Sequence, residues 1–248
     1  MNKVYDYLRN ESLPTKFCPG CGHGTILGSV IRAIDEMKLD IKKMVFVSGI
    51  GCGGWISSPN IDADTVHTTH GRAISVATGI KLTRPDLRVV VISGDGDLTT
   101  IGGNHLIHAA RRNITMTVIC ANNHIYGMTG GQTSGTTPMG IKTITDPRGN
   151  IYPGLNLAPL VKAAGANYVA RFTTYHVREL IRSIKKAFDT EGFSFIEAIY
   201  QCPTHYGKIT NRETVEMLKY FQKNSLNIKK AKELNEKEIK EKLVIGEF

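Results

Sequence analysis

The stretch RVVVISGDGDLTTIGGNHLIHAARRNITMTVICANNHIYG, residues 88–127, decides the fold of this chain. It opens with four apolar residues in a row, Val89–Ile92, which is typical of a central parallel strand buried on both faces. A GDGD motif follows, then a helix expected over Ile101–Arg112 and a second buried strand over Thr115–Ala121. That strand ends in Asn122-Asn123. The stretch therefore predicts one βαβ unit with a polar motif after each strand.

The same alternation continues on both sides of this unit. Short apolar runs predict strands, and apolar residues at helical spacing predict helices between them. We expect strands over 44–48, 168–171 and 193–199, and helices over 26–37, 72–82, 157–164 and 175–188. Alternating strands and helices predict an α/β fold with a doubly wound, mostly parallel sheet. The composition divides the chain into an N-terminal arm (1–16), a main domain (17–207) and a charged, helical C-terminal extension (208–248).

Composition excludes several classes of protein. Hydrophobic residues make up 41% and charged residues 21% of the 248 residues, so the chain is neither disordered nor fibrous. Its apolar runs are too short to cross a bilayer, and residues 1–16 lack the apolar core of a signal peptide. We therefore expect a soluble cytoplasmic protein that does not contact a membrane. The net charge of +9 favours acidic partners, but no basic surface interleaved with aromatic residues indicates nucleic-acid binding.

The GDGD and NN motifs predict a ligand site. In doubly wound sheets, ligands bind beyond the carboxyl ends of the strands, where both motifs stand. Asp95 offers an anionic oxygen and Asn123 a neutral one, which suits Mg²⁺ completed by substrate phosphates. The glycines let backbone amides approach a phosphate closely. The alternative is that GDG is only a turn between a strand and a helix, and the second motif one βα unit later argues against it.

Four of the five cysteines predict a metal or cluster site. Cys18 and Cys21 form a CxxC pair, while Cys52 and Cys202 each follow a predicted strand and should reach the same edge of the sheet. Four thiolates suit zinc or a [4Fe–4S] cluster by residue type alone. The separation of the third and fourth ligands favours the cluster. Cys120 lies inside a predicted strand and is expected to be a small buried hydrophobe.

These motifs carry a resemblance to a known family. GDG followed by NN resembles the thiamine-diphosphate motif. The runs FCPGCG (17–22), HTTHGRA (67–73) and NNHIYGMTGGQ (122–132) are similar to the beta subunits of 2-oxoacid:ferredoxin oxidoreductases. The resemblance covers residues 17–207 and implies a thiamine-diphosphate-binding fold. The implied reaction is the oxidative decarboxylation of a 2-oxoacid to acyl-CoA and CO₂, with coenzyme A as co-substrate and electrons passing through one [4Fe–4S] cluster to ferredoxin.

The resemblance also assigns roles to individual residues. It implies that Mg²⁺ is held by the side chains of Asp95 and Asn123 and by the carbonyl of Ile125. It implies that the cofactor diphosphate is lined by Gly94, Gly96, Asp97 and Thr129, and that the cluster is held by Cys18, Cys21, Cys52 and Cys202. The glutamate that activates the pyrimidine ring is expected on an alpha subunit, so this chain alone should be inactive. Gamma and delta subunits are left open.

Two side chains bear on catalysis and substrate. His70 is interpreted either as a proton or hydrogen-bond donor near the thiazolium or as a packed histidine at the start of a helix. Relatives that accept 2-oxoglutarate often carry a basic residue where Trp55 stands, and a distal carboxylate needs a cation. The motifs as a whole still favour 2-oxoglutarate, narrowly, over pyruvate or branched-chain acids. The alternatives are a thiamine-dependent decarboxylase or carboligase without a cluster, and a non-catalytic Cys₄ zinc module.

Overall fold

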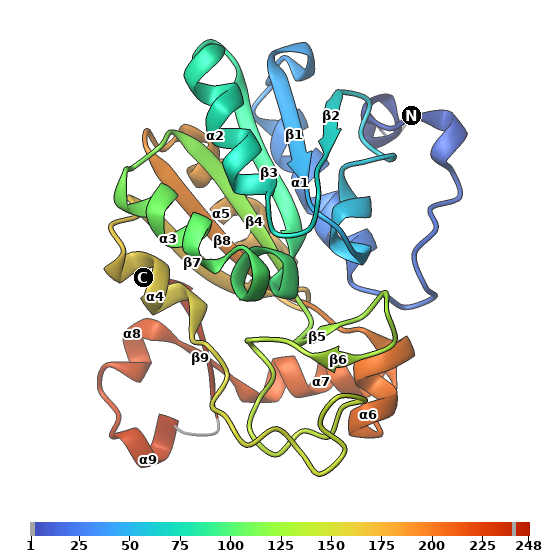
Figure 1. The fold of residues 1–248 in the computed structure, drawn as a ribbon, viewed down its shortest axis with the longest axis vertical. Helices are drawn as coiled ribbons and strands as arrows, with labels where there is room; N and C mark the ends of the chain where they lie inside the picture. Colours follow the sequence, from blue (N-terminus) through green and yellow to red (C-terminus); the bar gives the residue numbers. More distant parts are fainter. Residues whose placement is uncertain (1–2, 240–241) are drawn as a thin grey trace.

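The computed structural model describes residues 3–239 and 242–248, and these residues form an α/β fold around one large sheet (Figure 1). The sheet has the order β2-β1-β3-β4-β8-β7-β10-β9, and the strands from β2 to β7 are all parallel. The predicted doubly wound, mostly parallel sheet is confirmed. The parallel strands are β1 (Met44–Ser48), β2 (Asp64–His67), β3 (Arg88–Gly94), β4 (Met116–Asn122), β7 (Tyr168–Thr173) and β8 (Phe193–Ile199).

Helices cover both faces of the sheet because each carries one apolar side. One core lies under α1 (His23–Glu36) and α5 (Val177–Asp189), which also pack against each other. The opposite core lies under α2 (Ala73–Thr83), α3 (Gly103–Arg111) and α4 (Leu157–Ala163). Every residue of β4 and β8 is buried, as the continuous apolar runs predict for central strands.

Strand register brings the two polar motifs to one edge of the sheet. Gly94, at the end of β3, pairs with Ala121 near the end of β4. Asn122 in turn pairs with Ile199 at the end of β8. The segments that follow these parallel strands therefore leave the sheet side by side, as expected where ligands bind in such folds.

The C-terminal extension differs from the prediction. We expected a helical arm, but only short helices form: α6 (Lys208–Thr210), α7 (Thr214–Asn224), α8 (Ile228–Ala231) and α9 (Glu236–Ile239). Two strands, β9 (Ser225–Asn227) and β10 (Leu243–Glu247), belong to the main sheet, where β10 runs antiparallel to β7. The predicted helical arm is therefore interrupted by two strands, because residues 243–245 pair with β9, residues 246–247 pair with β7, and Ile245 is buried.

Smaller elements also escaped the sequence analysis. Strand β2 and the hairpin of β5 (Ile125–Tyr126) with β6 (Gln132–Thr133) were not predicted. The N-terminal arm forms short 3₁₀ helices, and the Tyr7 hydroxyl donates to Asp35 Oδ1 at 3.1 Å, so the arm packs on α1. The three-part division of the chain stays a prediction. Within the described ranges, no helix is long and apolar enough to span a bilayer.

Candidate active site

Asp95 stands at the centre of the predicted diphosphate site. It follows β3 directly, and its side chain is buried. Its Oδ2 accepts hydrogen bonds from Ser134 Oγ and Thr136 Oγ1, both at 2.6 Å, and its Oδ1 faces the Asn123 backbone N–H at 3.4 Å. Burial raises the pKa of Asp95, while the two hydroxyls oppose that rise. A bound cation would stabilise the charged carboxylate in the same way.

The predicted ligand residues surround one cavity. Asn123 is buried, and its Oδ1 accepts the Ile125 backbone N–H at 3.3 Å, which folds residues 123–125 into a tight turn beside Asp95. The structure brings all the residues predicted for this site together, although their roles stay predictions. The cavity is lined by His70, Gly94, Asp95, Gly96, Asp97, Asn123, Ile125 and Thr129. The acidic and amide oxygens fit a magnesium ion that also binds phosphate.

The carboxylate of Asp97, which also lines this cavity, is anchored by the protein itself. It is 1% exposed, and its Oδ1 accepts three bonds: from Gly71 N–H at 2.7 Å, from Ile50 N–H at 3.2 Å and from His70 Nδ1 at 2.5 Å. Its Oδ2 accepts the Ser93 hydroxyl at 2.9 Å. Asp97 therefore ties the segments after β1 and β2 to the end of β3, and it fixes the His70 ring against the cavity.

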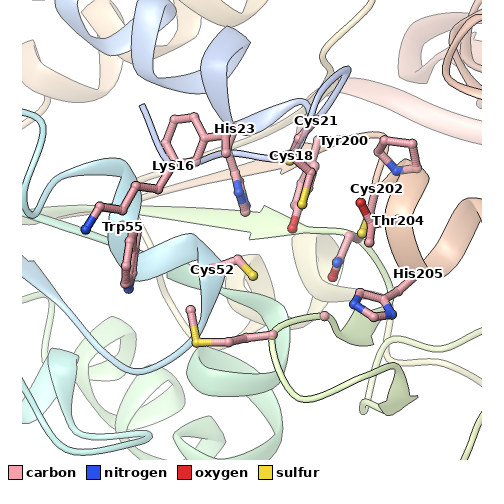
Figure 2. A pocket seen from close by; sticks show the side chains of 15 residues that line it. Lys16, Cys18, Cys21, His23, Cys52, Trp55, Tyr200, Cys202, Thr204 and His205 are labelled. Carbon is pink, nitrogen blue, oxygen red and sulfur yellow. The ribbon is translucent and has the colours of Figure 1, made fainter. Parts of the chain in front are cut away.

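The four predicted cysteines line a second cavity, of about 330 Å³. Figure 2 shows Cys18, Cys21 and Cys202 on one side of this cavity and Cys52 across from them. Within the residues that the structure describes, no three His, Cys, Asp or Glu side chains are placed to hold a single metal ion. Around one zinc ion, Zn–S bonds of about 2.3 Å would bring the sulfurs within about 4 Å of each other. Ligands at the corners of a four-iron cluster lie farther apart, so the wider arrangement fits the cluster better than zinc.

Local backbone bonds place the CxxC pair beside the last ligand. Cys21 N–H donates to the Cys18 carbonyl at 3.0 Å, and Gly22 N–H donates to the Gln201 carbonyl at 3.0 Å. The loop is thereby docked on the segment that leaves β8 and carries Cys202. This docking explains why a close pair and a distant cysteine meet.

The pKa values of two of these thiols are raised by their surroundings. Burial, together with the neighbouring cysteines, raises the pKa of Cys21 to about 12 and that of Cys52 to about 11. Four thiolates could coexist here only with positive charge among them, which an iron–sulfur core would supply. Cys120 is buried within β4, as predicted for a small hydrophobe.

The two cavities share a wall. The residues that line both are Cys52, Asn123, Gly127, Met128 and Tyr200. A Cβ built on Gly127 would lie 3.1 Å from Asn123 Nδ2 and 3.9 Å from Cys202 Sγ, so a magnesium-site residue and a cysteine approach the same glycine. The arrangement therefore sets the cavity predicted to bind the diphosphate directly beside the four-cysteine cavity, as electron transfer between two cofactors would require.

Sequence reasoning missed several residues of the site. Ser134 and Thr136, the hydroxyl partners of Asp95, lie between β4 and α4 in a long loop without periodicity, and the length of such a loop is the one signal that could have marked it as functional. Lys16, whose Nζ lies 5.2 Å from the centre of the Trp55 ring, also lines the cysteine cavity. No glutamate lines the diphosphate cavity in the described part of the chain, in keeping with one supplied from elsewhere.

Comparison with known proteins defines the class. Residues 51–198 match the family model for the C-terminal, cofactor-binding domain of thiamine pyrophosphate enzymes. The chain thus belongs to the thiamine pyrophosphate enzymes.

Full-length relatives narrow the class to one family. The chain is 49% identical, over 100% of its length and 92% of the relative, to the 2-oxoglutarate synthase subunit KorB of Methanocaldococcus jannaschii. It is 46% identical, over 79% of its length and 65% of the relative, to the 2-oxoacid:ferredoxin oxidoreductase subunit beta of Saccharolobus solfataricus. The chain belongs to the family of 2-oxoacid:ferredoxin oxidoreductase beta subunits and is one subunit of a larger oxidoreductase.

A solved structure gives the same result. The 2-oxoglutarate:ferredoxin oxidoreductase from Magnetococcus marinus, solved with 2-oxoglutarate, coenzyme A and succinyl-CoA bound, matches with a TM-score of 0.87 and 35% identity. The match covers 98% of this chain and 83% of that one. The predicted family is confirmed over the whole chain, including the C-terminal strands.

Proposed function

We propose that this chain acts in the cytoplasm as the beta subunit of a 2-oxoglutarate:ferredoxin oxidoreductase and binds thiamine diphosphate, Mg²⁺ and one [4Fe–4S] cluster. The observation that carries the proposal is the wall shared by the diphosphate cavity and the four-cysteine cavity. A decarboxylase or carboligase without electron transfer has no use for a four-thiol cavity at that place. We assign 2-oxoglutarate as the substrate because relatives that are 49–52% identical over the whole chain are 2-oxoglutarate synthase subunits.

In this proposal, the chain's own residues bind and orient the cofactor. Asp95, Asn123 and the Ile125 carbonyl hold Mg²⁺, and the backbone amides around Gly96 receive the diphosphate. When bound, thiamine diphosphate supplies the electron sink for decarboxylation. His70 lines the same cavity, and because its Nδ1 is bound to Asp97, its Nε2 is left to meet a ligand.

The four-cysteine site holds the group that passes electrons to ferredoxin. Cys18, Cys21, Cys52 and Cys202 hold the cluster, and electrons leave from it, one at a time, to ferredoxin. The net charge of +9 favours docking of an acidic electron carrier. The alpha subunit supplies the glutamate for the pyrimidine ring and the coenzyme A site, so both subunits are needed for turnover.

Lys16 is the candidate cation for the distal carboxylate of 2-oxoglutarate. Trp55 carries no positive charge for a carboxylate, but the exposed Lys16 ammonium lies against its ring at the rim of the cysteine cavity. Within the described residues, Lys16 forms no ion pair, so its charge is available to a ligand. The pair thus offers an apolar wall and a cation where the substrate needs both.

Analysis of the complex purified without air tests the cofactor part. We expect about four iron atoms per beta chain, lost in a Cys202→Ser variant, together with Mg²⁺-dependent binding of thiamine diphosphate. Cys120→Ser is the matched control and should keep its iron. A complex whose iron stays with the partner when the subunits are separated would overturn the cluster assignment.

Turnover with two acids tests the substrate part. We expect wild-type complex to prefer 2-oxoglutarate to pyruvate, and Lys16→Gln to raise the KM for 2-oxoglutarate about tenfold, the loss of about one charge-assisted contact. The kcat/KM for pyruvate should change less than about twofold, and Lys162→Gln on α4 should change neither. Equal losses for both acids would refute the role of Lys16, and a wild-type preference for pyruvate would refute the substrate.

A further inference from the structure

His23 is a buried histidine whose outer ring nitrogen has no partner. It is the first residue of α1 and is 1% exposed. Its Nε2 is inaccessible to solvent and, within the described residues, forms no hydrogen bond. Buried polar atoms are almost always paired, so an unpaired ring nitrogen indicates a partner that the polypeptide does not supply.

The ring is held firmly and faces the cysteine cavity. It packs on Tyr200 with ring centres 4.3 Å apart and on Phe17 at 5.4 Å. Its backbone N–H bonds to the sulfur of Cys21, which ties the histidine to the CxxC loop. Figure 2 shows the imidazole extending from the start of α1 into the space between the CxxC loop and Cys52.

Sulfur atoms are the acceptors that gather around the cavity that this nitrogen faces. Four cysteines line it with aromatic rings, a methionine and a proline, and the polar side chains of Lys16, Asn123, Thr204 and His205 complete its wall. A lysine only donates hydrogen bonds, whereas sulfides and thiolates accept them. An imidazole N–H at Nε2 therefore matches a sulfur acceptor inside the cavity.

We propose that His23 Nε2–H donates a hydrogen bond to a sulfur of the iron–sulfur cluster and raises its reduction potential. The proposal rests on the cluster assigned above to the four cysteines. Reduction adds one electron and one negative charge to the cluster; no covalent bond forms or breaks, and the imidazole proton stays on Nε2. Because a hydrogen-bond donor stabilises the more negative state, the reduced cluster is favoured. His23 is thus a positioning and tuning residue, distinct from the ligands.

A redox titration of the complete complex tests this. His23→Phe keeps a flat ring between Tyr200 and Phe17 and removes the N–H. At the midpoint potential of the wild type, where oxidised and reduced clusters are equal, we expect the variant to be about tenfold less reduced, a shift of about 59 mV for one electron. His23→Gln, which keeps an N–H donor, should recover part of the shift, and His108→Phe on the exposed face of α3 should show none. An unchanged midpoint in His23→Phe at full iron content would overturn the proposal.

A second measurement needs no variant. In wild-type complex labelled with ¹⁵N-histidine, pulsed EPR of the reduced cluster should detect a weak coupling to one imidazole nitrogen, of the size expected across a hydrogen bond. No coupling, or a strong one that indicates a direct iron–nitrogen bond, would refute the donor role even if His23→Phe failed to assemble. Iron analysis of the same sample separates this outcome from failure of the cluster assignment, because a chain without iron gives no signal to interpret.

Discussion

Replacing Asp97 should loosen two segments that form the mouth of the diphosphate cavity. Its carboxylate accepts the backbone N–H groups of Ile50 and Gly71, and Asp97→Ala leaves both without an acceptor. An unpaired buried donor costs about 1–3 kcal/mol, which is a factor of about 5 to 140 in local opening. Asp97→Asn keeps one oxygen that can still accept both N–H groups, although it loses the charge and the second acceptor oxygen, so we expect about a tenfold effect at most.

Hydrogen exchange of the assembled complex measures these effects directly. Peptides that contain Ile50 and Gly71 should lose protection by those factors in Asp97→Ala and by much less in Asp97→Asn. A peptide over β8 serves as the internal control, because β8 makes no bond to Asp97 and should exchange as in wild type. Unchanged protection at both amides in Asp97→Ala, or equal losses in the two variants, would show that the carboxylate does not hold these segments.

Three further predictions follow from contacts in the site and the sheet. A Cβ at Gly53 would lie 2.5 Å from a backbone nitrogen at the end of β3, so Gly53→Ala should displace the neighbouring cysteine and lower the iron content of the complex. Gly24→Ala is the control, because its Cβ would have open space around it, and this variant should keep four iron atoms per chain. Arg171→Met leaves Glu197 buried without its partner, and we expect a loss of about 3–5 kcal/mol in thermal unfolding that the double change to Met and Leu largely restores. Thr136→Val removes one of the two hydroxyls that bind Asp95, the carboxylate proposed to hold Mg²⁺, and should raise the Mg²⁺ concentration for half-saturation of thiamine diphosphate binding about tenfold. An unchanged concentration would contradict the role of that hydroxyl.

Sequence patterning was sufficient for the central sheet and insufficient at its edge. Strands β3, β4 and β8 are buried on both faces, so most of their residues are apolar on either face and their limits were predicted closely. Strand β10 is short and half-buried, and its segment follows a run of lysines and glutamates that favour helix. Its strand state depends on pairing with β7, a contact about 70 residues away, which local propensity cannot report.

The residues of the candidate site likewise fall into those that the sequence predicted and those that it did not. Motif residues such as Asp95 and Asn123 follow strands, and the parallel topology brings strand ends together, so their meeting was predictable. The hydroxyls of Ser134 and Thr136 reach Asp95 from about 40 residues away, across a loop that has no periodic pattern. The backbone contacts of Asp97 were not predictable, because a GDGD motif does not show which acid accepts N–H groups from the segments after β1 and β2.

The proximity of the two proposed cofactors is a consequence of parallel pairing. The segments that carry Cys52, Asp95, Asn123 and Cys202 follow β1, β3, β4 and β8, which are consecutive neighbours in the sheet. Neighbouring strands lie about 4.8 Å apart, so four consecutive strands span only about 15 Å at their carboxyl ends. The CxxC loop then needs one docking contact, at Gln201, to complete the thiol set. Moving any of these segments to the opposite end of its strand would separate the thiols from the predicted diphosphate site, so the order of the strands accounts for the proximity on which the proposed electron transfer depends.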